Sequence, residues 1–254
     1  MTPGTLSVVD AGNTAVKVVR FDPAGRVVDA RRSLHGPGER SVLEGIGEGD
    51  GIAAVASSDR GRTLLREWAE ALGRPVRLAG IDFPLGVSNR TLRPEETGAD
   101  RLAAARGAFL RSAGPAVAVG VGTAITVDIV EGKGAFLGGA IAPGLWSSAA
   151  GLAVAAPRLP AAVLDPGRAP PALPGRTTEE ALRAGVFLGF AGLIDRLVEE
   201  ALPVAAGEGG NPAAVRVYFH GGDAAALGPL VRVPFVEAPH LVAEGVRDAW
   251  TRFG

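Results

Sequence analysis

The chain has no cysteine and only one methionine, one tyrosine and three histidines among its 254 residues. The missing cysteines exclude disulfide bonds, thiolate metal sites and a cysteine nucleophile, and they favour a reducing compartment. The histidines, His35, His220 and His240, are far apart and show no metal-ligand spacing. We therefore interpret them as turn or surface residues, neither ligands nor bases.

The chain also lacks a charge bias, with 26 Lys and Arg against 27 Asp and Glu and a net charge of -1. Without a basic block there is no electrostatic reason to expect nucleic acid or an anionic membrane as a partner. The N-terminal segment has no basic region and carries Asp10, unlike a secretory signal. The longest uncharged stretch, residues 134–157, holds five glycines and Pro143, which favours a packed segment over a membrane span. We expect a cytoplasmic protein.

The two common nucleotide-binding motifs are missing as well. No Walker A pattern occurs, and the single Gly-x-Gly-x-x-Ala string, at residues 49–54, precedes a strand pattern instead of following one. Nucleotide binding therefore needs other residues.

A strand, turn, strand pattern occurs twice. Residues 6–9 form an apolar strand that turns through Gly12, Asn13 and Thr14 and returns as residues 15–21, which predicts a β-hairpin. Residues 116–121, a turn at Gly122 and Thr123, and a return over 125–130 repeat the pattern about 110 residues later, followed by a strand at 136–141. The spacing predicts duplicated α/β domains over residues 1–115 and 116–254.

The remaining periodicities place helices between and after these strands. We expect a strand at 52–56, helices at 63–72 and from Pro94 to about 113, a strand at 215–219 and a last helix at 241–253. Thr177 and Glu180 form a capping box that begins a long helix ending near Leu202.

The two Gly-Thr turns are candidate phosphate sites. Small residues let backbone N–H groups approach phosphate oxygens, and a threonine hydroxyl adds a donor. Asp10 at the strand end is placed to hold Mg²⁺ through water, and Lys17 supplies a positive charge for phosphate. The alternative for either turn alone is a plain hairpin.

Asp100 is the candidate base. It falls in the first turn of its helix, where the helix dipole favours the ionised carboxylate and a substrate hydroxyl can reach it. The alternative is a favourable first-turn charge without a chemical role.

Four separated strings carry a family resemblance: DAGNTAVK at 10–17, PEETGADR at 94–101, GTAITVD at 122–128 and LGGAIAPGL at 137–145. With them the chain resembles the type III pantothenate kinases over nearly its whole length. Leu159-Pro160, Thr178 within TTEEALRAG and Gly221-Gly222 agree with the same family.

The resemblance implies an α/β fold of two duplicated actin-like (ASKHA, ribonuclease H-like) domains with an interdomain cleft, and a homodimer. It implies ATP-dependent phosphorylation of pantothenate to 4′-phosphopantothenate, the first step of coenzyme A biosynthesis. ATP and Mg²⁺ are the implied cofactors, together with K⁺ or NH₄⁺ as a monovalent cation.

The resemblance also implies roles for individual residues. The implied ATP contacts are Asp10, Ala11, Gly12, Asn13, Thr14, Ala15, Val16, Lys17, Gly122 and Thr123, with Asp10 near Mg²⁺. The implied pantothenate contacts are Gly98, Ala99, Asp100, Arg101 and Thr178. Asp100 would accept the proton of the primary hydroxyl, a task for which an unperturbed aspartate suffices because phosphoryl transfer depends mostly on positioning and charge neutralisation.

The chain departs from the family at four positions. Gly120 stands where the family has an aspartate that binds the monovalent cation, so that acidic ligand is missing. Thr91 replaces a tyrosine that packs against pantothenate, and Arg93 replaces an asparagine. His220 replaces the threonine before the Gly-Gly pair, a change to which we give little weight.

Three hypotheses follow from these patterns. The first is an active pantothenate kinase that has lost or relaxed its monovalent-cation requirement. The second is a catalytically weak homologue that binds nucleotide and acts as a regulatory or accessory protein. The third is a kinase of the same fold for another small hydroxyl compound.

Overall fold

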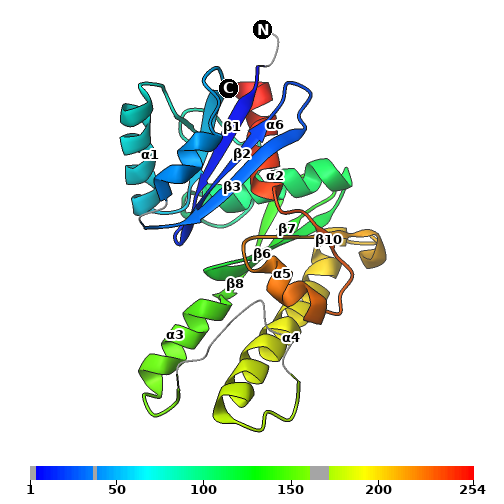
Figure 1. The fold of residues 1–254 in the computed structure, drawn as a ribbon. Helices are drawn as coiled ribbons and strands as arrows, with labels where there is room; N and C mark the ends of the chain where they lie inside the picture. Colours follow the sequence, from blue (N-terminus) through cyan, green and yellow to red (C-terminus); the bar gives the residue numbers. More distant parts are fainter. Residues whose placement is uncertain (1–3, 37–38, 161–171) are drawn as a thin grey trace. The chain divides into compact units, whose positions relative to one another are not determined.

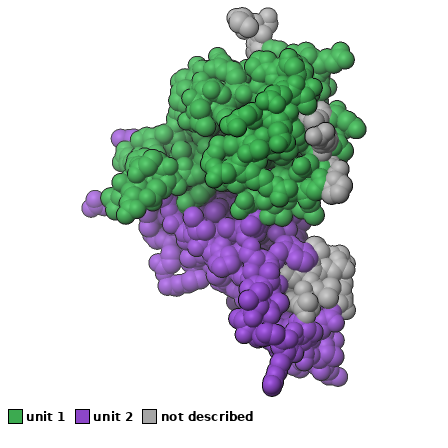
Figure 2. Space-filling view, turned by 90° about the vertical axis from the view of Figure 1, so that its left-hand side faces the viewer, with its two compact units in different colours: residues 1–113, 134–136, 240–254 green, residues 114–133, 137–239 purple. Residues whose placement is uncertain are grey.

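A computed structural model of the chain describes residues 4–36, 39–160 and 172–254. The chain divides into two compact units, which Figure 2 draws in different colours. Unit 1 comprises residues 1–113, 134–136 and 240–254, and unit 2 comprises residues 114–133 and 137–239. Among the described residues, no helix combines the length and the apolar character needed to cross a membrane.

Unit 1 is built on a five-stranded sheet in the order β3-β2-β1-β4-β5 (Figure 1). Its strands are β1 (Leu6–Ala11), β2 (Ala15–Phe21), β3 (Val27–Leu34), β4 (Gly51–Ala56) and β5 (Arg77–Leu78). Its helices are α1 (Asp59–Leu72), α2 (Ala99–Ser112) and α6 (Leu241–Phe253), with 3-10 turns η1 (Glu39–Gly45) and η2 (Pro94–Glu96). Strands β1 to β3 are antiparallel, whereas β4 runs parallel to β1.

The alternation of side chains along β1 and β2 separates the two faces of this sheet. Val9, Ala11, Val16 and Val18 form one apolar cluster with Trp68 of α1. Helices α2 and α6 pack against each other and contact the sheet at β4 and β1 (Figure 1). Because neighbouring residues on a strand point to opposite faces, Asp10 and Lys17 project away from the cluster that contains α1.

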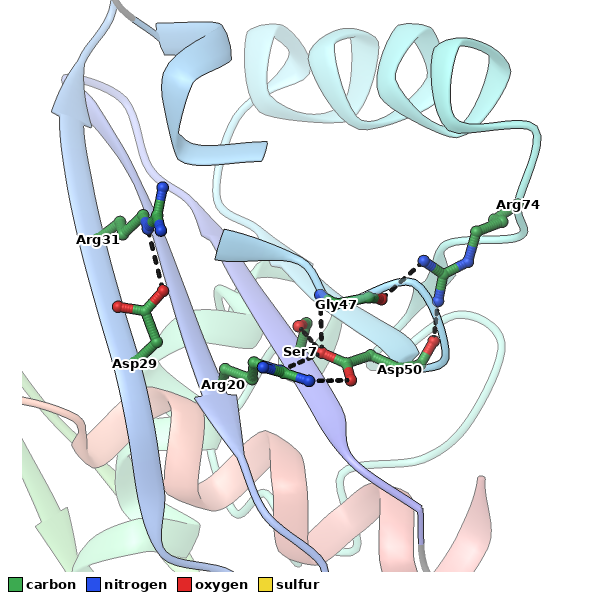
Figure 3. Close-up of polar contacts among 7 residues, drawn as sticks. All are labelled: Ser7, Arg20, Asp29, Arg31, Gly47, Asp50 and Arg74. Carbon is green, nitrogen blue, oxygen red and sulfur yellow. Dashed lines mark hydrogen bonds and ion pairs between the residues drawn. The ribbon is translucent and has the colours of Figure 1, made fainter. Parts of the chain in front are cut away.

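A buried carboxylate ties three segments of unit 1 together (Figure 3). Asp50, just before β4, accepts hydrogen bonds from Ser7 Oγ of β1 at 2.6 Å, Arg20 Nε of β2 at 2.8 Å and the Gly47 backbone at 3.0 Å. Arg74, just after α1, donates to the carbonyls of Gly47 and Asp50. Burial alone would raise the pKa of Asp50, but its hydrogen bonds outweigh burial and lower the pKa to about 2.

Unit 2 repeats this plan with a sheet in the order β10-β9-β6-β7-β8. Its strands are β6 (Ala116–Val121), β7 (Ala124–Val130), β8 (Phe136–Pro143), β9 (Arg216–His220) and β10 (Val236–Glu237). Its helices are α3 (Leu145–Ala155), α4 (Thr178–Ala206) and α5 (Ala224–Leu227), with 3-10 turns η3 (Pro212–Ala214) and η4 (Gly228–Leu230). Helix α4 buries Phe187, Ile194 and Val198 in the core formed with β6 and β7.

The same strand order in both sheets confirms the predicted α/β duplication. In each unit an antiparallel hairpin, β1–β2 or β6–β7, lies beside a parallel pair, β1–β4 or β6–β9. The structure differs from a simple division at residue 115 because α6, although it ends the chain, packs on α2 in unit 1.

Candidate active site

The first predicted hairpin forms at the joint of β1 and β2. Gly12 N–H donates to the Ala15 carbonyl at 3.0 Å, which closes a turn whose tip residues, Asn13 and Thr14, are exposed. Asp10 and Lys17 are direct partners across the two strands, so their side chains lie side by side on one face of the sheet.

Asp10 lies close enough to Asp100 for their charges to interact. The pKa of Asp10 is raised to about 7. Burial is the largest cause, the negative charge of Asp100 adds to the rise, and the charge of Lys17 opposes it. The structure thus brings together the two carboxylates that the sequence separates by ninety positions. A pair of half-buried carboxylates beside a glycine turn suits a divalent cation.

Asp100 lies in the first turn of α2, as predicted. Backbone N–H groups of Asp100 and Arg101 stabilise its charged form, yet burial outweighs them and raises the pKa of Asp100. The predicted effect of the helix dipole, which favours the ionised carboxylate, is thus opposed by burial.

Lys17 lies beside Asp10, and the charge of Lys17 also acts on His240. Burial lowers the pKa of Lys17, and the charge of Asp10 works against that change. Burial also lowers the pKa of His240, at the start of α6, and Lys17 lowers it further, while Glu244 raises it. Of these two groups, Lys17 is the one whose charge acts on Asp10.

Gly98, Ala99 and the residues before them border a cavity of about 340 Å³ within unit 1. The other walls come from the ends of β4 and β5 and from the start of α1: Ala56, Ser57, Arg62, Leu78, Ala79, Gly80 and Ile81, with Glu95, Glu96 and Thr97. The cavity thus lies at the carboxyl ends of two parallel strands, where ligand sites of α/β sheets occur.

Thr91, which replaces the family tyrosine, is engaged within its own loop. Its hydroxyl donates to Asn89 Oδ1 at 2.9 Å and lies 3.3 Å from the hydroxyl of Thr97. Arg93 pairs with Glu96 at 2.8 Å. These contacts hold the segment that leads into Gly98, without an aromatic ring.

The second predicted hairpin forms in unit 2 between β6 and β7. Gly122 N–H donates to the Ala124 carbonyl at 3.1 Å. The Thr123 carbonyl accepts from Gly144 N–H at 3.0 Å and from Ser147 Oγ at 2.6 Å. A Cβ at Gly144 would lie 1.9 Å from the Gly122 carbonyl oxygen, so only glycine allows this approach. The LGGAIAPGL segment therefore holds the second turn, a role that its sequence alone does not indicate.

Gly120 and His220 are neighbours in the sheet of unit 2. Gly120 pairs with Thr126 of β7 on one side and with His220 of β9 on the other. A Cβ at position 120 would lie 2.7 Å from Thr126 Oγ1 and 3.0 Å from His220 Cε1. The imidazole of His220 thus occupies space beside position 120, a proximity that the sequence alone does not show.

Thr178 begins α4 and is exposed, directly after the N-cap Thr177. The capping box predicted for Thr177 and Glu180 is present in both directions. Thr178, Gly122 and Thr123 belong to unit 2, whereas residues 10–17 and 98–101 belong to unit 1.

The interpretation of all three histidines as turn or surface residues is wrong for His220, which ends β9, whereas His35 lies in the bend after β3 with its ring buried. Only 5% of its side chain is exposed, and its ring contacts the Gly12 carbonyl and the Glu39 carboxylate, each at 2.9 Å. A contact to a backbone carbonyl leaves no pattern in the sequence, so spacing could not reveal it.

The fold is that of the actin-like (ASKHA) class, with its sheet repeated in two units. Over 98% of its length the chain superposes on the activator of the 2-hydroxyisocaproyl-CoA dehydratase from Clostridium difficile with bound ADPNP, covering 95% of that structure. The TM-score is 0.59 and the sequence identity 14%. This likeness shows the fold alone.

The sequence comparisons identify the family within this class. The family profile for type III pantothenate kinase matches residues 6–200. The chain is 34% identical over 269 residues to the type III pantothenate kinase of Oleidesulfovibrio alaskensis, covering 99% of this chain and 98% of that one. It is 34% identical over 283 residues to that of Rhodopirellula baltica, covering 94% and 96%. The chain belongs to the type III pantothenate kinase family.

Proposed function

We propose that this protein transfers the γ-phosphoryl group of ATP to pantothenate and forms 4′-phosphopantothenate, the first step of coenzyme A biosynthesis. The observation that carries the proposal is that Asp10 lies beside Lys17 and close to Asp100 in unit 1, in a chain of this family. The reaction is placed in the cytoplasm.

Each of the two hairpin turns is proposed as a phosphate-binding segment of its own unit. In the first, the residues from Asp10 to Lys17 offer backbone N–H groups at an exposed tip and one ammonium group. In the second, Gly122 and Thr123 offer the same kind of turn. Because phosphoryl transfer spreads charge over the phosphate oxygens, such donors act mainly by positioning and neutralisation.

The carboxylate of Asp10 is the residue that would hold Mg²⁺. Among residues 4–36, 39–160 and 172–254, no group of three or more acidic or histidine side chains is arranged to bind a metal. A single carboxylate with water and phosphate oxygens is a usual environment for Mg²⁺ in kinases. When bound, the ion neutralises the charge of the phosphates.

Asp100 is proposed as the base that accepts the proton of the pantothenate hydroxyl. Its raised pKa makes the carboxylate more basic than an exposed aspartate and therefore a better proton acceptor near neutral pH. The adjacent residues Gly98, Ala99 and Arg101 would contact the acceptor. The cavity beside Gly98 and Ala99 is the proposed place for the acceptor chain, and Thr178 of unit 2 is proposed as a further contact.

A monovalent cation does not fit the residues at position 120. Glycine supplies no carboxylate, and Thr126 and His220 take up the space in which a side chain at 120 would stand. We therefore propose that the reaction of this enzyme needs neither K⁺ nor NH₄⁺.

A homodimer formed through α3 completes the proposal. Helix α3 has the uncharged sequence LWSSAAGLAVA, and Trp146 and Val154 are 49% and 82% exposed. Ile141 on β8 is 64% exposed. An exposed apolar surface of this kind is typical of an interface.

Asp100→Asn tests the assignment of the base. Asparagine keeps the shape of the side chain but cannot accept the proton, so we expect kcat for pantothenate-dependent ADP release to fall by about 10³-fold. ATP binding, measured by calorimetry, should stay within about twofold, because the first hairpin is untouched. Full activity in this variant would refute the assignment.

A further inference from the structure

The ring of His35 contacts the first hairpin. His35 follows the last residue of β3, and its ring is buried beside the turn. Nε2 lies 2.9 Å from the carbonyl oxygen of Gly12, and Nδ1 lies 2.9 Å from Oε2 of Glu39 in η1. The backbone N–H of His35 donates to the carbonyl of Thr14 at 3.0 Å. One residue thus contacts two of the three residues of the turn.

The partners define what the ring does. A carbonyl oxygen only accepts, and an ionised carboxylate only accepts. Both ring contacts are therefore hydrogen bonds at the same time only when each ring nitrogen carries a proton. Glu39 is suited to support that form, because the hydrogen bond from His35 lowers the pKa of the Glu39 carboxyl despite the opposing effect of burial. The guanidinium of Arg60, on α1, lies 3.8 Å from the same carboxylate oxygen.

The two carbonyls held by His35 fix the direction of two N–H groups. In a planar trans peptide the C=O and the following N–H point in opposite directions. With the Gly12 carbonyl directed at the ring, Asn13 N–H points away from it. With the Thr14 carbonyl directed at the backbone of His35, Ala15 N–H points away from that backbone.

We propose that His35 is a positioning residue of this kinase: it holds the peptides of the Gly12–Thr14 turn so that their N–H groups face the polyphosphate of ATP. The inference rests on the proposed function, because it needs the turn to bind phosphate. His35 itself touches neither ATP nor pantothenate. Glu39 orients the ring, and the ring orients the turn.

Binding of Mg²⁺-ATP by the full chain, measured calorimetrically without pantothenate, tests this role. His35→Leu removes both ring hydrogen bonds and should weaken ATP binding about tenfold, roughly the loss of one well-aligned charge-assisted hydrogen bond. His35→Gln keeps an amide N–H for the Gly12 carbonyl and should bind ATP within about threefold of the unchanged protein. Leu34→Ala, the neighbouring residue on β3, is 57% exposed and serves as the matched control.

A second readout separates positioning from general stability. If His35 acts on the turn, the KM for ATP rises in His35→Leu while the KM for pantothenate stays within about twofold. An equal rise of the KM values for ATP and for pantothenate in His35→Leu, together with a lowered unfolding midpoint, would mean a structural role. That result would overturn the inference. The same holds if His35→Leu binds ATP as the unchanged protein does, or if His35→Gln is as weak as His35→Leu. Failure of the unchanged protein to bind ATP would overturn the proposed function as well.

Discussion

At the scale of single residues, two aspartates of unit 1, Asp50 and Asp10, have pKa values shifted in opposite directions by their environments. Asp50 is surrounded by donors that lower its pKa to about 2, whereas burial and, next to it, the charge of Asp100 raise the pKa of Asp10 to about 7. The environment of Asp50 stabilises its ionised form and thereby the fold. The environment of Asp10 disfavours the ionised form at the place where a cation and phosphates are proposed to bind. Perturbed pKa values of this second kind are typical of functional sites.

The Asp50 network predicts a pH-dependent contribution to stability. Its folded pKa lies below the ordinary value of 3.8, so its stabilisation is complete above about pH 4 and is lost as the pH falls towards 2. Asp50→Asn should therefore lower the free energy of unfolding at pH 7 by about 2 kcal/mol, measured by urea denaturation. The loss should shrink below pH 4.

Asp29→Asn is the matched control for this prediction, because Asp29 pairs with Arg31 at 2.9 Å where both side chains are more than a third exposed (Figure 3). Exposed pairs contribute little, so we expect a change below about 0.5 kcal/mol. Equal losses in the two variants would show that the buried network has no special role.

At the scale of elements, the neighbouring strands β6 and β9 of unit 2 carry one departure from the family each. Gly120 on β6 is paired with His220 on β9, and the imidazole of His220 lies beside the place where a side chain at position 120 would be. Each replacement alone looks minor in the sequence. A side chain at position 120 would meet Thr126 Oγ1 and the imidazole of His220, and on this ground we propose that the cation site is not preserved.

The paired variant Gly120→Asp with His220→Thr should reintroduce cation dependence. The unchanged enzyme is expected to turn over within about twofold at equal K⁺ and Na⁺, and the paired variant at least about fivefold faster in K⁺. ADP release in the two buffers measures the ratio. His220→Thr alone supplies space without a carboxylate and should stay insensitive to the cation. K⁺ dependence of the unchanged enzyme would contradict this account.

The elements differ in how well the sequence predicts them. Helix α6 begins and ends at the predicted residues 241 and 253, and the strands of both hairpins lie where their apolar runs place them. Strand β3 has no clear strand signal, because its run VVDARRSL mixes charged residues into an edge strand. Helix α3 has no helical signal either, since its small apolar residues give no amphipathic period.

The residues of the candidate site also differ in how well the sequence predicts them. The hairpin at 10–17 and the first-turn position of Asp100 are predictable because turn residues and helix starts have local signals. The desolvation that raises the pKa of Asp100 depends on how α2 packs, and the contact between His35 and Gly12 spans 23 positions. Both depend on packing that no local pattern encodes.

At the scale of the whole molecule, the apolar α3 surface predicts self-association. We expect a dimer in sedimentation velocity, and Val154→Glu should shift it towards a monomer, because a buried unpaired charge is costly at an interface. Val204→Glu is the matched control, a substitution at a 51% exposed valine on α4. A monomeric unchanged protein, or equal effects of both variants, would count against the α3 interface.

The central claim is that this chain phosphorylates pantothenate. The most direct test is ADP release from Mg²⁺-ATP by the purified protein, with and without pantothenate, combined with mass spectrometry of the acceptor. The account predicts ADP release that depends on pantothenate, with one 4′-phosphopantothenate formed for each ADP. ATP binding without pantothenate-dependent ADP release, or release that requires a different hydroxyl acceptor, would contradict it.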